Sequence, residues 1–336
     1  MPRRTKVGLS EIANYSNLSE ALFLAAAGRR NRRYVQQFLE HAPQRLGDLS
    51  DSLFSERWRP SEMTEFVIYD PKRRLIHAPR FPDRIVHHAL ILQVGEHLDR
   101  MQIDDSFACR VGKGPLKAVE RAQHFGRRFR WYLKMDVAGY FHSIRHSVLL
   151  EFVSRRIADA AVLRLFCRIL EGFQATPGTG LPIGALTSQH LANLYLAGFD
   201  RWMTGQSACR GYVRYMDDMV VWCQTRSDAK ALLLSATELL GDVWQLQLKG
   251  QSQINRASAG LPFCGYRIYP GIIRLTRRKK LIYRRICTHW EEQYRLGRVT
   301  AAQLQAGMAS ALAAVQAAES LAWRRNEMQR SQSGEV

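Results

Sequence analysis

The sequence predicts an α+β fold in which helices and short strands alternate irregularly, and two kinds of pattern support this prediction. Apolar residues recur at helical spacing over 18–41, 83–98, 147–170, 186–203, 228–248 and 279–325. Short apolar runs bounded by turn residues indicate strands at 65–69, 74–77, 131–137, 212–223 and 261–275. With 336 residues, of which 46% are hydrophobic, the chain can bury a large core.

The first elements expected are the helix over 18–41 and a strand hairpin. Residues 65–69 read Glu-Phe-Val-Ile-Tyr, and aromatic and β-branched residues favour a strand. Asp70-Pro71 is a turn signal, so 74–77 is the expected return strand. The helix over 83–98 follows.

The later elements surround a strong strand candidate at 131–137. After the helix over 147–170, a segment rich in Pro and Gly leads into the helix over 186–203. Residues 212–223 divide into two short strands joined by a tight turn. Beyond the helix over 228–248 and the short strands of 261–275, the chain is helical and Ala-rich at its centre.

The charge of the chain predicts a polyanionic partner. Lys and Arg number 49 and Asp and Glu 30, a formal net charge of +19. Nucleic acid and an anionic membrane are the two candidates. No apolar run reaches about 18 residues, so no membrane-spanning helix is expected. Basic clusters occur along the whole length, which suits a long nucleic-acid channel better than one docking patch.

The six cysteines are scattered, at least 14 residues apart, so the sequence contains no Cys-x-x-Cys pair and predicts no zinc knuckle. Reduced thiols and a cytoplasmic location are expected. The segment 1–9 is basic but lacks the apolar stretch of a signal peptide.

Three acidic residues stand where apolar strands end. Asp217 and Asp218 fall at the tip of the hairpin within 212–223, and Asp136 ends the strand at 131–137. Asp is common in turns, which is the plain explanation for the first two. An unpaired carboxylate at the end of a buried strand is costly, however, and a divalent cation would remove that cost. Two such sites could hold two Mg²⁺ ions, so the pattern predicts nucleotidyl transfer.

These residues lie in an order of blocks that resembles reverse transcriptases over roughly 15–275. Tyr215-Met216-Asp217-Asp218 resembles the catalytic hairpin of the palm. The other blocks that carry the resemblance are 66–79 with 83–90, 106–114, 134–141, 180–189 and 263–266. The resemblance implies a right-hand polymerase with fingers, a palm of antiparallel sheet and helices, and a short helical thumb.

The block at 180–189 narrows the resemblance. Most reverse transcriptases have Gln before the glycine and end the block in Ser-Pro, whereas this chain has Ile183 and Gln189. That pattern resembles the enzymes of diversity-generating retroelements, which are bacterial or phage-encoded. The resemblance implies that the chain copies a template-repeat RNA into cDNA, misincorporates mainly at template adenines, and works with a small basic oligomeric accessory variability protein.

The resemblance also implies roles for the acidic residues. Asp136 and Asp217 are the expected main ligands of two Mg²⁺ ions, with Mn²⁺ as an alternative ion. The backbone carbonyl of Val137 is a further expected ligand. Asp218 is expected to be a weaker metal ligand, or an acid that contacts the ligands and not the metal. Phe141 is the expected steric gate, whose ring would clash with a ribose 2′-hydroxyl.

The remaining expected contacts are with nucleotides and with the duplex. The residues expected at the incoming dNTP are Lys72, Arg74, Arg110, Ile183 and Gly184. The expected primer grip is Phe263, Cys264, Gly265 and Tyr266. Phosphate contacts along the duplex are expected from Arg277, Arg278, Lys279 and Lys280. The lysine expected after the palm hairpin has no exact match, because Gln251 holds the nearest position and Lys249 is two residues away.

The expected division of the chain is an N-terminal helical extension over 1–60, fingers over 61–130, palm over 131–275 and a helical thumb and tail over 276–336. Two alternatives remain open. One is a retron-like or antiphage-defence reverse transcriptase, although Arg298-Val299-Thr300-Ala301 stands where a retron enzyme typically has Val-Thr-Gly. The other is a catalytically silent RNA-binding protein, against which the three retained acids argue.

Overall fold

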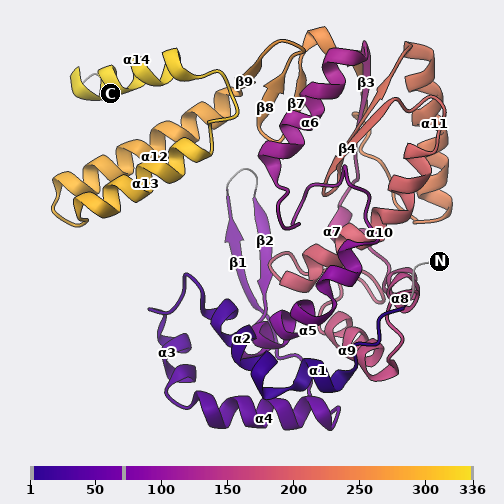
Figure 1. Cartoon of the computed structure of the whole chain (residues 1–336), viewed down its shortest axis with the longest axis vertical. Coiled ribbons are helices and arrows are strands. Elements are labelled where there is room, and N and C mark those ends of the chain that lie inside the picture. The colour runs from indigo at the N-terminus through magenta and orange to yellow at the C-terminus, as the bar shows by residue number, and fades with distance from the viewer. Residues whose placement is uncertain (1–3, 70–72, 334–336) are drawn as a thin grey trace. The chain divides into compact units, whose positions relative to one another are not determined.

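The computed structural model describes residues 4–69 and 73–333, which form two compact units (Figure 1). The described residues of 1–104, 137–202 and 237–248 make up the first unit. Those of 105–136, 203–236 and 249–336 make up the second. Helices and antiparallel sheets occur together in the chain, so the α+β prediction is confirmed. The predicted four-part division stays a prediction.

The first unit is mainly helical. Its helices are α1 (Leu9–Ala13), α2 (Tyr15–Ala26), α3 (Arg33–Leu39), α4 (Ala42–Phe54), α5 (Phe81–Asp99), α7 (Tyr140–Ser143), α8 (His146–Ser154), α9 (Ala160–Glu171) and most of α10 (Leu186–Thr204). Helix α5 is buried along most of its length and packs on α2. The hairpin of β1 (Thr64–Ile68) and β2 (Arg74–Ala78) pairs Phe66 with Ile76, as the two predicted strands require.

The second unit contains two antiparallel sheets. The larger has the order β4-β5-β3-β6, with β3 (Trp131–Asp136), β4 (Gly211–Tyr215), β5 (Asp218–Cys223) and β6 (Gln253–Arg256). The smaller has β7 (Leu261–Phe263), β8 (Tyr266–Ile268) and β9 (Ile273–Leu275) in that order. Strand β5 is buried from Met219 to Cys223, which explains why its sequence is a continuous apolar run.

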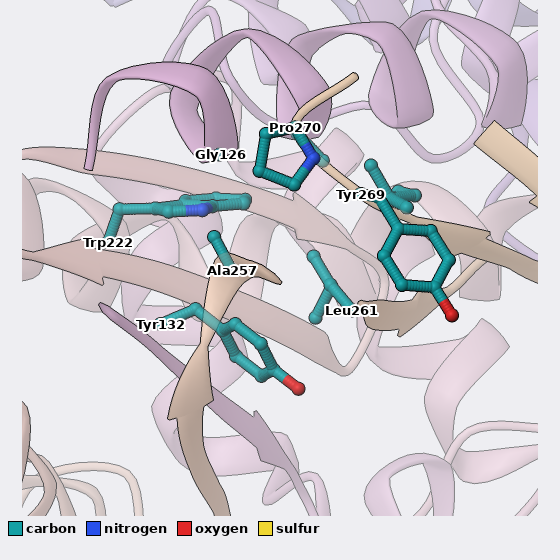
Figure 2. Close-up of a pocket in the computed structure, with 9 residues that line it drawn as sticks. Gly126, Tyr132, Trp222, Ala257, Leu261, Tyr269 and Pro270 are labelled. Atoms are coloured by element: carbon teal, nitrogen blue, oxygen red, sulfur yellow. The ribbon is translucent and has the colours of Figure 1, made fainter. Parts of the chain in front are cut away.

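Helix α6 (Pro115–Arg128) covers this sheet through close contacts at glycines. A Cβ at Gly211 of β4 would lie 2.3 Å from the Phe125 ring, so only glycine allows the helix to approach. Figure 2 shows the small pocket that remains, where the Trp222 indole, Tyr132 and Leu261 face Gly126 and Pro270. The pocket is lined mainly by apolar side chains, so it belongs to the core of the unit.

Three helices complete the second unit: α12 (Arg277–Arg295), α13 (Ala301–Ala313) and α14 (Leu321–Ser333). Helices α12 and α13 pack against each other where Gly307 meets Trp290, and a Cβ at Gly307 would lie 2.2 Å from the indole. Trp323 of α14 packs edge-on against Tyr283 of α12, with ring centroids 5.4 Å apart. Helix α11 (Arg226–Asp242) follows β5, and the division between the two units falls within it, after Ala236.

Several predicted helices are shorter than expected. The helix over 18–41 is interrupted between α2 and α3, where Gly28 has φ +68° and four exposed arginines crowd one short segment. The helix over 147–170 breaks after α8 because Asp159 caps α9, accepting from the Val162 N–H at 2.9 Å. The helix over 228–248 ends at Asp242, and Gln245 has φ +53°.

The helical region over 279–325 is also divided. Gly297 adopts φ +68° after α12, and Thr300 and Gln303 cap α13 reciprocally. The break between α12 and α13 therefore has a local cause in a left-handed residue and a cap. Within the described residues, no helix has the length and apolar composition to cross a membrane. All six cysteines are free thiols.

Candidate active site

The tip of the β4–β5 hairpin carries two of the predicted acids. Tyr215 pairs with Asp218, so Met216 and Asp217 form a two-residue turn. Met216 has φ +60°, a left-handed conformation that non-glycine residues seldom adopt. The guanidinium of Arg214, which is fully buried, donates to the Met216 carbonyl at 3.0 Å. This bond supports a strained turn, as is common where a turn serves a site.

The pairing of β3 with β5 brings the third acid to the same place. Asp136 is directly opposite Asp218 in the antiparallel register. Asp217 lies near enough to Asp136 for the two carboxylates to interact. The structure therefore gathers Asp136, Asp217 and Asp218 in the second unit, at one end of the sheet.

The environment of Asp217 and Asp218 opposes the ionisation of their carboxyl groups. Burial, followed by the negative charge of Asp136, raises the pKa of Asp217. Burial also raises the pKa of Asp218, to about 6, although the Lys134 ammonium acts in the opposite direction. Carboxylates held in this way are stabilised by an added cation.

Two lysines that were not predicted as site residues contact the acids. Lys134 of β3 donates to Asp218 Oδ2 at 2.9 Å. The Lys249 ammonium forms an ion pair with the Asp136 carboxylate, and its backbone N–H donates to the Asp136 carbonyl at 2.8 Å. Lys134 had a signal in the sequence, because residues two apart in a strand share a face and Lys134 precedes Asp136 by two.

The donor set fits Mg²⁺. The oxygen Asp218 Oδ1 is buried and has no hydrogen-bond partner among the described residues, so it could accept a cation. No group of three or more His, Cys, Asp or Glu side chains within 4–69 and 73–333 is arranged around one metal position. Mg²⁺ does not need such a cage, since it is commonly held by one or two carboxylates and by substrate phosphates. Val137, whose carbonyl was predicted as a ligand, is fully buried.

Phe141, Ile183 and Gly184 lie together in the first unit. The Leu181 N–H donates to the Phe141 carbonyl at 2.7 Å, and the His77 N–H of β2 donates to the Ile183 carbonyl at 3.0 Å. These bonds place the 181–184 segment between α7 and the β1–β2 hairpin. Phe141 therefore neighbours the segment that carries Ile183 and Gly184, and these three predicted dNTP residues lie near one another.

Gly184 is held in a conformation that requires glycine. Its φ is +130°, and a Cβ there would lie 2.9 Å from Ile76 Cγ2 and 3.0 Å from the His77 carbonyl oxygen. The hairpin strand β2 therefore packs directly on the glycine backbone.

The predicted triphosphate-binding cations differ in their surroundings. Arg74 is exposed at the start of β2, and Lys72 lies outside the described residues. Arg110 belongs to the second unit, where its guanidinium donates to the Ser106 carbonyl at 2.9 Å. Only Arg74 of these three is therefore both described and in the unit of Phe141 and Gly184.

The predicted primer grip forms the β7–β8 hairpin. Phe263 and Tyr266 are paired and buried, so they are core residues. Cys264 and Gly265 form the turn, with φ of +46° and +78°. Burial raises the pKa of the Cys264 thiol, which makes it a neutral packing group. Of the two turn residues, Gly265 is exposed and Cys264 is partly buried.

The four basic residues at the start of α12 fall into two pairs. Arg277 and Arg278 are exposed. The Lys279 ammonium lies 3.4 Å from the centroid of the Tyr266 ring, and Lys280 lies 5.2 Å from that of Trp323. Burial lowers the pKa of Lys279 to about 8. Two of the four cations are thus engaged with aromatic rings.

Comparison with known proteins shows which family the chain belongs to. The sequence model of the family Reverse transcriptase (RNA-dependent DNA polymerase) matches residues 70–251, more than half of the chain. Protein YkfC of Escherichia coli K12 is 24% identical over 272 residues, which cover 66% of this chain and 70% of YkfC. The Group II intron-encoded protein LtrA of Lactococcus lactis is 27% identical over 141 residues, 39% of this chain and 23% of LtrA.

Among solved structures, the chain is similar to apo telomerase from Candida tropicalis, with a TM-score of 0.47 and 9% identity. The alignment covers 65% of this chain and 49% of the telomerase chain. The chain thus spans about half of that protein and less than a quarter of LtrA.

Proposed function

This chain belongs to the reverse transcriptase family of RNA-dependent DNA polymerases, and from that premise we propose that it copies a template-repeat RNA into cDNA. The observation that supports the proposal best is the register that sets Asp136 opposite Asp218, with Asp217 in the adjoining turn. Three partly buried carboxylates that share two lysine partners suit a reaction in which metal and triphosphate bind together.

In this proposal Asp136 and Asp217 hold two Mg²⁺ ions, or Mn²⁺ in their place. Bound metal supplies activation of the primer 3′-hydroxyl and stabilisation of the leaving pyrophosphate. Asp218 keeps its hydrogen bond to Lys134. It acts as a weaker metal ligand, or as an acid that contacts the ligands and not the metal. Lys249, which is half-exposed, would give up its ion pair with the Asp136 carboxylate to a bound metal ion.

The proposed dNTP site uses the residues of the 181–184 segment and its neighbours. Phe141 acts as the steric gate, and its ring packs edge-on against Tyr140, with ring centroids 5.9 Å apart. A fixed ring can reject a ribose 2′-hydroxyl by contact alone. Arg74, with Lys72, neutralises the triphosphate.

We further assign the chain to the diversity-generating class on account of Ile183. An isoleucine cannot offer the amide hydrogen bonds of the usual glutamine, so geometric checking of the nascent pair is weaker. The Ile183 backbone is fixed by the His77 N–H, so a change of side chain leaves the segment in place. We expect Ile183→Gln to lower the error rate at template adenines severalfold. An unchanged error rate would exclude this role.

The first experiment is extension of a DNA primer on a defined RNA with Mg²⁺ and dNTPs, followed by deep sequencing. We expect errors concentrated at template adenines in the wild type and no product from Asp217→Ala. Asp242→Ala is the matched control, because Asp242 is an exposed aspartate at the end of α11. Product from Asp217→Ala would contradict the proposed site, and accurate copying would contradict the proposed class.

The proposed partners are template RNA, the cDNA primer and product, dNTPs and a small basic oligomeric accessory protein. Because this chain itself carries +19, a basic protein cannot be held by charge complementarity alone. We expect the two proteins to associate through shared RNA. Co-purification that is lost after ribonuclease treatment would support this arrangement, and ribonuclease-resistant association would contradict it.

A further inference from the structure

Lys134 makes two hydrogen bonds, of which the proposed reaction explains only the one to Asp218. Its ammonium donates to Asp218 Oδ2 at 2.9 Å and to the Pro262 carbonyl at 2.8 Å. It also lies 5.9 Å from the centroid of the Phe263 ring. The side chain is only 18% exposed, so both hydrogen bonds are shielded from water.

The two acceptors belong to different sheets of the second unit. Asp218 begins β5 of the larger sheet, and Pro262 is the middle residue of β7 in the smaller sheet. Strand β7 is at the edge of its sheet, paired only with β8 among the described strands. The outward Pro262 carbonyl is therefore satisfied by a lysine rather than by another strand.

The far side of the β7–β8 hairpin is also held. Thr276 Oγ1 donates to the Gly265 carbonyl at 2.9 Å, and Lys279 covers the Tyr266 ring. The β7–β8 hairpin is thus held by the Lys134 bond to Pro262 and by the contacts of Thr276 and Lys279 at the start of α12.

We propose that Lys134 is a positioning residue that fixes the β7–β8 hairpin relative to the catalytic turn, so that the primer 3′ end is presented to Asp136 and Asp217. This inference rests on the proposed function. The Lys134 contact joins the strand before the primer-grip turn to an acid beside the catalytic pair. Its loss removes the bond between the hairpin and the catalytic turn, and the expected metal ligands Asp136 and Asp217 stay in place.

Lys249 provides the matched control. Each lysine pairs with one carboxylate of the same cluster, so Lys134→Met and Lys249→Met remove the same charge. Lys249 is 47% exposed and its side chain contacts Asp136 rather than β7. A defect in primer placement should therefore follow the loss of Lys134 alone.

The test measures recognition of the primer end without turnover. Fluorescence anisotropy with Ca²⁺ gives dissociation constants for an RNA–DNA duplex with a recessed primer 3′ end and for a blunt duplex of equal length. We expect the wild type to prefer the recessed end roughly tenfold and Lys134→Met to lose this preference, as the loss of a charge-assisted bond predicts. Lys249→Met and Lys134→Arg should keep it within about twofold.

The outcomes are distinguishable. A recessed-end preference that survives in Lys134→Met, or is absent from the wild type, overturns the inference. If Lys134→Met does not fold, Lys134→Gln decides in the same way, because glutamine is too short to reach both acceptors. Loss of preference in a chain that makes no cDNA would uphold this inference and contradict the proposed function. An active enzyme whose Lys134→Met variant keeps the preference contradicts the inference alone.

Discussion

Gly184→Ala adds one methyl group at a position where the backbone and its neighbours both exclude it. The φ of +130° is a region that residues with a Cβ rarely adopt, and such strain costs about 1–3 kcal/mol. The new Cβ would also lie 2.9 Å from Ile76 Cγ2 and 3.0 Å from the His77 carbonyl oxygen. Overpacking of this kind costs about 1–3 kcal/mol. We expect a total loss of about 2–4 kcal/mol in the free energy of unfolding, because relaxation relieves part of each.

Substitutions at two other glycines distinguish the cost of backbone strain from the cost of steric overlap. Gly178 has φ +75°, and a Cβ added there would have nothing within 4 Å, so Gly178→Ala should cost about 1 kcal/mol. Gly47 lies inside α4 with free space and ordinary helical geometry, so Gly47→Ala should stabilise by about 0.5–1 kcal/mol. Urea unfolding followed by circular dichroism measures all three. The reasoning fails if Gly184→Ala costs no more than Gly178→Ala.

The same substitution has an expected effect on catalysis. Displacement of the 181–184 segment would move β2, because the His77 N–H donates to the Ile183 carbonyl. We expect the KM for dNTP to rise several-fold while duplex affinity stays the same. A change in duplex affinity with an unchanged KM for dNTP would contradict the proposed place of Gly184 at the nucleotide.

Three further predictions concern charge and packing. Asp217→Asn should stabilise the metal-free protein more at pH 8 than at pH 3, because the raised pKa of Asp217 penalises a charged form that is largely absent below its ordinary pKa of 3.8. Thermal unfolding in EDTA at both pH values tests this, and an equal shift would contradict it. Glu56→Gln should lower the melting temperature at pH 7, because the Arg164 hydrogen bond lowers the pKa of Glu56 to about 2. The difference in melting temperature between wild type and variant should fade as the pH falls from about 4.5 to about 2. A difference that stays constant over this range would argue against the ion pair. Gly211→Ala should cost about 1–3 kcal/mol by pushing on the Phe125 ring, and a neutral effect in urea unfolding would contradict the α6 contact.

The strands and the family could be predicted because their signals are local. The apolar runs at 131–137 and 212–223 became β3, β4 and β5, and the predicted tight turn is the one that holds Asp217. The order of short blocks predicted the reverse transcriptase family, which the family match confirms. The diversity-generating class and the individual site roles stay predictions.

Helix ends were less predictable because capping competes with apolar periodicity. The repeat over 147–170 continues through the gap between α8 and α9, and only the Asp159 cap marks the new start. Helix α6 was not predicted, because its apolar stripe is narrow and lies among many basic residues. Pro115 at its first position was a signal for its start.

The contacts of the site depend on long side chains that bridge distant segments. Lys134 and Pro262 are 128 residues apart, and no periodicity in the sequence relates them. Lys249 was recognised only as a lysine out of register, yet its ammonium pairs with Asp136. Strand register and side-chain reach determine such contacts, so they became visible only in the structure.

The most direct test of the central claim is single-nucleotide addition to a primer on an RNA template, measured as a function of Mg²⁺ concentration for the wild type and for Asp136→Asn. If Asp136 and Asp217 form the centre of nucleotidyl transfer, addition by the wild type rises with Mg²⁺ and requires more than one ion, and Asp136→Asn adds no nucleotide at any concentration. Addition that is independent of Mg²⁺, or that persists in Asp136→Asn, would contradict the account.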